Sequence, residues 1–203
     1  YFLLKKDYPS IPNIKMHLHK KIPMGAGLGG GSSDGAFTLV TLNQLFNLQL
    51  SEQALLDYAL QLGSDCPFFI LNTPAFATGR GEILTPTTVN LNGYSIIIVN
   101  PGIAISTKLA FSLITPKAPD NNLLAVIQQP ITTWKDELIN DFEEPIFNSF
   151  PELANIKETL YQKGAVYASM TGTGSTVYGI FPTSMMDTLS FNFPTHYFIA
   201  TAS

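Results

Sequence analysis

The segment from Lys20 to Ala36 reads KKIPMGAGLGGGSSDGA, and it is the part of the chain that decides the fold. Between Gly25 and Gly31, six of the seven residues are glycine or alanine. Glycine in such numbers is costly in backbone entropy, so the run indicates left-handed turns or the close approach of another group. Two serines and then a strongly apolar stretch follow the run.

The pattern around this run predicts a strand, a glycine-rich loop and a buried helix, in that order. Residues 14–19 alternate apolar and polar side chains, which is the period of a half-buried strand. Residues 36–46 carry apolar side chains on nearly every face, as a central, buried helix does. Free N–H groups in such a loop and at a helix N-terminus favour an anion. We therefore expect a phosphate site, where the hydroxyls of Ser32 and Ser33 suit phosphate oxygens or a phosphate-bound Mg²⁺.

Other nucleotide loops fit this segment less well. Residues 25–30 satisfy the dinucleotide pattern G-x-G-x-x-G, but the acidic residue near the required spacing, Glu52, stands at a predicted helix start. A Walker A loop needs a lysine after its last glycine, where Gly31 and Ser32 stand instead. The HRD and DFG motifs of protein kinases do not occur in the sequence. A tight glycine turn without a ligand stays open as an alternative.

Length and composition narrow the class of protein. The 203 residues, 45% of them hydrophobic, are enough for one large domain or two small ones with proper cores. The sequence has neither a long apolar run typical of a membrane span nor a stretch with the order of a signal peptide. Its single cysteine, Cys66, excludes an internal disulfide, and its net charge of −4 includes no basic block for nucleic acid. We expect a cytoplasmic protein without a membrane or nucleic-acid partner.

The remaining patterns predict an α+β protein of two domains, residues 1–92 and 93–203. A change of pattern near residues 91–93 sets that boundary, and the second half resembles a ferredoxin-like sandwich. Turn glycines with short extended pieces occupy residues 74–86. Helices are expected at the first residues and over 52–62, 107–113, 134–140 and 151–163; strands are expected over 66–71, 94–99, 166–170, 176–181 and 196–201.

Four motifs resemble those of the GHMP kinase superfamily, the small-molecule kinases of galactose, homoserine and mevalonate type. Residues 23–33 look like its phosphate loop, and residues 63–69 (GSDCPFF) look like its catalytic-aspartate segment. Residues 79–82 (GRGE) match its following turn, and residues 172–175 (GTGS) match the glycine motif that packs near the phosphate loop. The resemblance implies an incomplete ribosomal-protein-S5-like N-terminal domain followed by a ferredoxin-like C-terminal domain.

The triple glycine before the serine pair resembles one branch of the superfamily more closely. That branch phosphorylates a hydroxyl of 4-diphosphocytidyl-2-C-methyl-D-erythritol on the non-mevalonate route to isoprenoid precursors. The resemblance therefore implies ATP and Mg²⁺ as cofactors and a cytidyl diphosphate sugar alcohol as substrate, and a homodimer is compatible with it. Another GHMP kinase, of mevalonate, homoserine or sugar type, and a non-catalytic nucleotide-binding module remain as alternatives.

The same resemblance assigns roles to individual residues. Asp65 would take or orient the hydroxyl proton in apolar company, and a turn cap is its alternative role. Arg80 and Phe111 would meet the cytidyl substrate, Phe111 as a stacking surface for the base. A place in the core is the alternative for Phe111. Lys20 would lie at the edge of the nucleotide, and a solvated strand end is its alternative. Gly172, Thr173 and Gly174 would support the phosphate loop. The nucleotide would be bound by Lys20, Pro23, Met24, Gly25, Ala26, Gly27, Leu28, Gly29, Gly30, Gly31, Ser32 and Ser33.

The sequence departs from the family's pattern at its start. The family opens with a strand that carries an Ala-Lys-Ile-Asn-like motif, whose lysine pairs with the catalytic aspartate, and a nearby Tyr-His pair grips the cytidine. No such motif precedes Tyr1. We therefore expect the chain to lack the family's N-terminal segment. As it stands it should be inactive or nearly so, because Asp65 would lack its partner.

Overall fold

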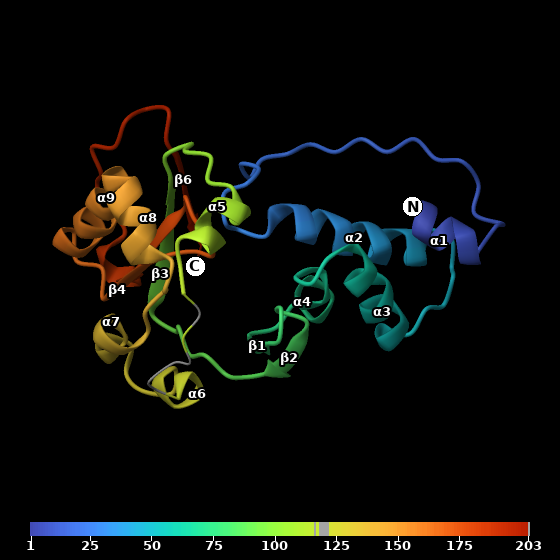
Figure 1. Cartoon of the computed structure of the whole chain (residues 1–203), viewed down its shortest axis with the longest axis horizontal. Coiled ribbons are helices and arrows are strands. Elements are labelled where there is room, and N and C mark those ends of the chain that lie inside the picture. The colour runs from blue at the N-terminus through green and yellow to red at the C-terminus, as the bar shows by residue number, and fades with distance from the viewer. Residues whose placement is uncertain (116, 118–121, 203) are drawn as a thin grey trace. The chain divides into compact units, whose positions relative to one another are not determined.

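The computed structural model describes residues 1–115, 117 and 122–202, and Figure 1 labels its helices and strands. The mixture of helices and sheets confirms the predicted α+β class. The helices are α1 (Phe2–Asp7), α2 (Gly30–Leu45), α3 (Glu52–Leu62), α4 (Cys66–Leu71), α5 (Thr107–Ser112), α6 (Leu123–Val126), α7 (Trp134–Glu137), α8 (Glu143–Ser149) and α9 (Pro151–Gln162), with 3-10 turns at Ile131–Thr133 and Thr183–Met185. The strands are β1 (Ala75–Thr78), β2 (Ile83–Pro86), β3 (Tyr94–Asn100), β4 (Tyr167–Met170), β5 (Val177–Pro182) and β6 (Phe198–Ala202).

The chain divides into two compact units. The first comprises residues 1–21 and 29–88, and the second comprises residues 22–28 and 89–203. By its contacts the glycine-rich loop therefore belongs to the second unit, although α2, which follows it directly, belongs to the first. The domain boundary placed between residues 92 and 93 from the sequence stays a prediction.

The first unit is built from α1, α2, α3 and α4, with the hairpin of β1 and β2 following them in the chain. Helix α3 has the predicted bounds. The hydroxyl of Ser51 caps it by accepting a hydrogen bond from the N–H of Ala54, and Gly63 follows its last turn. Leu4 of α1 and Leu39 of α2 are buried in the common core, together with Leu42, Leu55, Ala59 and Cys66.

Two strands predicted for the first unit are wrong. Residues 66–71 form α4, because Pro67 suits the first turn of a helix and a short apolar run has the same composition in a buried helix as in a buried strand. Residues 14–19 form no strand. Their alternation of side chains is present, but a strand needs a hydrogen-bonded neighbour, and the described residues pair none with this segment.

Helix α2 is not enclosed on every side by the described residues, contrary to the prediction. Ala36 and Leu39 are buried toward α3 and α4, whereas the side chains of Phe37 and Leu45 are 48% and 66% exposed. The open side carries a shallow groove of about 230 Å³, which is lined by Met16, Leu18, Asp34, Phe37, Thr38, Thr41 and Leu42.

The second unit is a four-stranded antiparallel sheet in the order β4-β5-β3-β6, with helices packed on it (Figure 1). Alternate residues of β3 point to two different cores. Ile97 and Val99 pack with α9 and α8 on one side, and Ile96 packs on the cluster of Trp134 and Tyr167 on the other. All four strands fall where the sequence predicts them. None of the described helices is long and apolar enough to cross a membrane.

Candidate active site

The loop's glycines are required where the backbone turns and where the protein packs against it. Gly25, Gly27 and Gly29 have φ angles of +66°, +75° and +64°, a left-handed region that disfavours other residues. A Cβ on Gly27 would lie 2.3 Å from the carbonyl oxygen of Thr171. A Cβ on Gly29 would lie 2.8 Å from Cζ of Phe69. The protein's own packing therefore excludes side chains at Gly27 and Gly29.

Two other glycines of the run border open space. A Cβ on Gly25 or on Gly31 would have no neighbouring atom within 4 Å. Gly31 also lies in the first turn of α2, where alanine would be accepted by the helix. Packing within the described residues thus gives no reason for glycine at position 31, whereas a ligand that approaches the backbone would give one.

The loop is fastened to a turn between β4 and β5. The hydroxyl of Thr171 donates a hydrogen bond of 2.8 Å to the carbonyl of Gly27, and the N–H of Thr176 donates one of 3.2 Å to the carbonyl of Ala26. A Cβ on Gly172 would lie 3.3 Å from the carbonyl oxygen of Gly27. The structure therefore brings the GTGS motif and the loop together within the second unit.

The start of α2 lacks a side-chain cap. Its N-cap residue is Gly29, which has no capping group, and the first intrahelical bond runs from the N–H of Ser33 to the carbonyl of Gly29. The preceding N–H groups of the first turn have no partner within the helix. With the positive end of the helix dipole, they make this terminus suitable for a phosphate group.

Lys20 forms an ion pair with Asp34, a residue that the sequence did not single out. Its Nζ lies 2.5 Å from Oδ2 of Asp34 in α2, and the two side chains are 24% and 33% exposed. A partly exposed pair of this kind is worth at most about 1 kcal/mol, so an anion could compete for the lysine at low cost. Asp34 directly follows the serine pair, and that position is the signal that could have pointed to it.

Asp65 precedes α4 at its N-cap position and makes no side-chain capping bond there. Its side chain is exposed, so the apolar company expected from the sequence is wrong; the buried neighbours, Cys66 and Pro67, face the core instead. The carboxylate lies beside the predicted GRGE turn, since a Cβ on Gly81 would be 3.0 Å from Oδ1 of Asp65. An exposed carboxylate next to an open turn is available to a substrate.

Ser32 contacts Cys66, which follows Asp65 in the chain. Burial raises the pKa of the Cys66 thiol; a hydrogen bond with the side chain of Ser32 opposes that rise, and the charge of Asp65 adds to it. The thiol is therefore protonated at neutral pH and does not act as a nucleophile. Within the first unit, Ser32 thus contacts the thiol of Cys66, the residue that follows Asp65.

The two residues expected to meet the cytidyl substrate are both accessible. Arg80 lies on the turn between β1 and β2, with its side chain 77% exposed. Its N–H donates a bond of 2.6 Å to Glu82, whose pKa is lowered by backbone N–H groups, its own and that of Arg80. Phe111 lies on α5 in the second unit, is 58% exposed and meets the ring of Phe142 edge to face, with centroids 5.1 Å apart. Since it is exposed, Phe111 is not a core residue.

Sequence reasoning missed the polar residues that support the GTGS turn. The side chain of Asn140 donates to the carbonyls of Met170 and Gly172, and Glu143 accepts from the N–H of Met170. No local pattern ties these residues to a turn about thirty positions later. The described residues hold no cluster of three or more His, Cys, Asp or Glu side chains suited to a metal ion.

Two family models match the chain, one over most of the first unit and one over part of the second. The GHMP kinases N terminal domain matches residues 1–77, and the GHMP kinases C terminal domain matches residues 125–185. A homoserine kinase from Cytophaga hutchinsonii shares the fold, with a TM-score of 0.66 at 14% identity over 91% of this chain and 68% of its own. The domains and the fold are therefore those of GHMP kinases, a class of small-molecule kinases.

Closer relatives define the branch. The 4-diphosphocytidyl-2-C-methyl-D-erythritol kinase of Azobacteroides pseudotrichonymphae is 50% identical over 98% of this chain, and that of Bacteroides thetaiotaomicron is 51% identical over 89%. A crystal structure of 4-(cytidine 5'-diphospho)-2C-methyl-D-erythritol kinase superposes with a TM-score of 0.69 at 34% identity over 79% of the chain. The chain belongs to the 4-diphosphocytidyl-2-C-methyl-D-erythritol kinase family. It spans 74%, 66% and 59% of the lengths of these three proteins, respectively.

Proposed function

We propose that the protein transfers the γ-phosphoryl group of ATP to a hydroxyl of 4-diphosphocytidyl-2-C-methyl-D-erythritol. The observation that carries this proposal is the glycine segment, whose left-handed backbone leads into an uncapped helix N-terminus. Such a segment offers N–H groups to the phosphates of a nucleotide. The names of the relatives supply the acceptor.

In this proposal the segment from Gly25 to Ser33 binds the phosphates of ATP. The open backbone at Gly25 and Gly31 lets phosphate oxygens approach the chain closely. Lys20 then exchanges part of its contact with Asp34 for the nucleotide. Pro23, Met24 and Leu28 flank the loop, and the side chain of Met24 is 86% exposed, as a contact with the nucleotide requires.

Asp65 is the residue we assign to proton transfer. The substrate hydroxyl attacks the γ-phosphorus, the bond to the β-phosphate oxygen breaks, and the hydroxyl proton passes to the carboxylate of Asp65. The exposed position of that carboxylate supports the assignment, because a base must come within hydrogen-bond reach of the proton it takes. Arg80 and Phe111 are assigned to the cytidyl part of the acceptor.

Mg²⁺ would be held mainly by the phosphates and water, with Ser32 or Ser33 as the protein ligand. Mg²⁺ usually keeps several waters and binds few protein groups, so the hydroxyl pair at the start of α2 fits it. When bound, the ion neutralises charge that develops on the phosphate oxygens. A cytoplasmic location and a homodimer, both expected from the sequence, stay predictions.

Release of ADP from ATP and Mg²⁺ tests this function. The assay would offer 4-diphosphocytidyl-2-C-methyl-D-erythritol, mevalonate, homoserine and galactose in turn, to this chain and to the full-length product of its gene. We expect turnover with the cytidyl acceptor alone, and only by the full-length product. Turnover with another acceptor would overturn the substrate, and no turnover of any acceptor by the full-length product would overturn the function. The inactivity predicted for the 203 residues alone is tested by the same comparison.

A further inference from the structure

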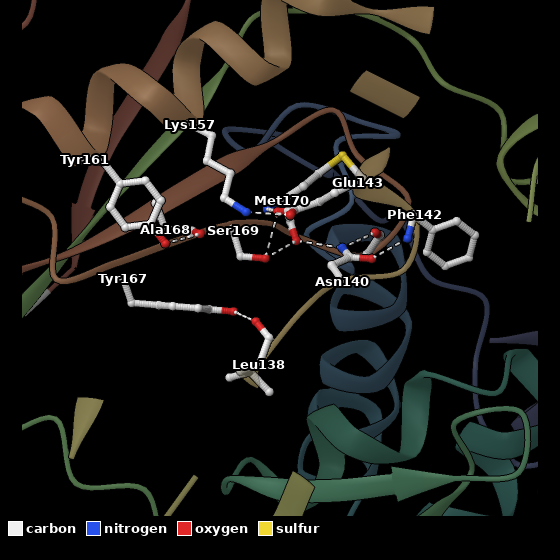
Figure 2. A network of polar contacts seen from close by, with 11 residues as sticks. Leu138, Asn140, Phe142, Glu143, Lys157, Tyr161, Tyr167, Ala168, Ser169 and Met170 are labelled. Atoms are coloured by element: carbon white, nitrogen blue, oxygen red, sulfur yellow. Dashed lines mark hydrogen bonds and ion pairs between the residues drawn. The ribbon is translucent and has the colours of Figure 1, made fainter. Parts of the chain in front are cut away.

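A network of polar side chains surrounds the end of β4, where the chain enters the GTGS turn. Figure 2 shows Asn140, Glu143, Lys157 and Ser169 converging on the backbone near Met170. All of these residues lie in the second unit, as does the loop of residues 22–28. None of them belongs to the site residues assigned above.

Glu143 holds this backbone from the amide side. Its Oε1 accepts a bond of 2.7 Å from the N–H of Met170 and one of 3.0 Å from the hydroxyl of Ser169. Its Oε2 lies 2.5 Å from Nζ of Lys157. The side chain of Glu143 is only 8% exposed, and a carboxylate is buried to this degree only when its oxygens are paired. The acid is therefore fixed in place by its own partners.

Asn140 holds the same backbone from the carbonyl side. Its Nδ2 donates bonds of 2.8 Å to the carbonyl of Met170 and 2.9 Å to the carbonyl of Gly172. Its Oδ1 accepts from the N–H of Phe142 at 3.0 Å, which fixes the orientation of the carboxamide. One side chain thus uses both of its donors to set the distance between two carbonyls of the turn.

The fastened turn is in direct contact with the glycine loop. Between the two carbonyls held by Asn140 lies Thr171, whose hydroxyl donates to Gly27 at 2.8 Å. The fit tolerates little movement, since a Cβ on Gly27 would come within 2.3 Å of the carbonyl oxygen of Thr171. Any shift of the turn must therefore move the loop or break its contact.

We propose that Asn140 and Glu143 are positioning residues for the phosphate loop. They touch neither the nucleotide nor the acceptor in this proposal. They hold Met170 and Gly172 so that Thr171 presents one fixed surface to Gly27. The nucleotide part of this inference rests on the proposed function, whereas the coupling of turn and loop does not.

The test compares Asn140→Asp with Asn155→Asp by hydrogen exchange and nucleotide titration. Asn140→Asp keeps the shape but replaces the donors with an acceptor that faces two carbonyls. Asn155, which is exposed on α9, is the matched control for the same chemical change. Peptides covering residues 23–29 and 171–176 report on the loop and the turn, and a peptide from β3 reports on global stability. A fluorescent ATP analogue with Mg²⁺ reports on binding.

We expect exchange in residues 23–29 and 171–176 to become at least about tenfold faster in Asn140→Asp, because two hydrogen bonds of about 1 kcal/mol each are lost. Exchange in β3 should stay unchanged, and the dissociation constant of the analogue should rise by about the same factor. Glu143→Gln keeps an oxygen for Met170, so it should fall between the wild type and Asn140→Asp. Asn155→Asp should behave as the wild type.

Unchanged exchange in residues 23–29, with faster exchange in residues 171–176, would overturn the positioning role. If Asn140→Asp raises exchange everywhere, Asn140→Ala decides, because it removes the donors without adding charge. Equal acceleration in β3 and in the loop of that variant would assign Asn140 to global stability and overturn the proposal. A wild type that binds no ATP analogue would contradict the proposed function, while the exchange data would still decide the coupling.

Discussion

The two units treat their parts of the glycine segment in different ways. In the second unit, Ala26 and Gly27 are fixed by hydrogen bonds to the turn between β4 and β5, and Gly27 has no room for a methyl group. In the first unit, Gly31 borders open space and Asp65 is exposed. The tight contact that constrains the loop backbone and the exposed carboxylate therefore lie in different units. The second unit fixes the backbone at Ala26 and Gly27, whereas the first unit leaves Gly31 and the Asp65 carboxylate open.

The largest effect is expected from Asp65→Asn, which removes the proposed proton acceptor and keeps the shape. We expect kcat to fall by about 10²–10⁴-fold, the range of general-base catalysis, while the dissociation constant of the ATP analogue changes little. Steady-state ADP release on the full-length product and nucleotide titration measure the two quantities. An unchanged kcat would remove Asp65 from the chemistry.

The second effect tests the supporting unit. Gly27→Ala places a methyl group against the carbonyl of Thr171 at a left-handed φ of +75°. We expect a loss of about 1–3 kcal/mol in the free energy of unfolding and a matching weakening of ATP-analogue binding, because the loop must move away from its turn. Urea unfolding and titration measure both. A variant that keeps wild-type stability and affinity would show that the contact does not constrain the loop.

The third prediction compares two glycines of the same helix. Gly31→Ala and Gly35→Ala both add a methyl group to α2, and each should raise the free energy of unfolding by about 0.5–1 kcal/mol. The methyl on residue 35 would meet Leu62 at an ordinary 3.4 Å. Only Gly31→Ala should weaken binding of the ATP analogue, because only its methyl group occupies space proposed for the ligand.

If both variants bind the analogue as the wild type does, the open space at Gly31 is not part of the nucleotide site. If both weaken binding equally, the effect comes from the helix as a whole, and the distinction between open and packed glycines fails.

The smallest effect uses one tyrosine in each unit. A hydrogen bond to Asp7 is the main cause that raises the pKa of Tyr58 to about 12, and burial, with a bond to Glu152, raises that of Tyr197 to about 12. A raised pKa means that the folded state holds the proton more tightly. The stabilisation is therefore complete below the ordinary pKa of 10.0 and is lost as the pH rises toward 12.

Tyr58→Phe and Tyr197→Phe should each lose less stability than the wild type between about pH 9 and about pH 11, by under about 1 kcal/mol. Urea midpoints at the two pH values measure this loss. The two variants report on the two units separately, because each variant removes the titrating tyrosine of one unit. An identical decline in the wild type and in both variants would show that neither bond survives in solution.

Local patterns predicted much of the fold, and they failed where a distant partner decides. Helix α3 and strand β3 follow directly from a cap and from a β-branched run. Residues 66–71 have no periodicity that separates a buried strand from a short helix, and only the packing of α4 on α2 and α3 decided it. Residues 14–19 have the alternation of a strand but no paired neighbour among the described residues.

The glycine segment could be interpreted from its residues because its signal is local. Gly25, Gly27 and Gly29 do adopt the left-handed backbone that such a run indicates. The support of the loop could not be predicted in the same way. Asn140 reaches a carbonyl thirty residues away, and an asparagine before a helix has an ordinary role as a cap.

The most direct test of the central claim is a titration of the ATP analogue with Mg²⁺ into protein labelled with ¹⁵N at its 15 glycines. Amide resonances would be followed by NMR. We expect saturable shifts at Gly25, Gly30 and Gly31, and none at Gly93 and Gly164. Saturable binding that leaves the loop glycines unmoved, or the absence of any shift, would contradict the assignment of this segment as the nucleotide site.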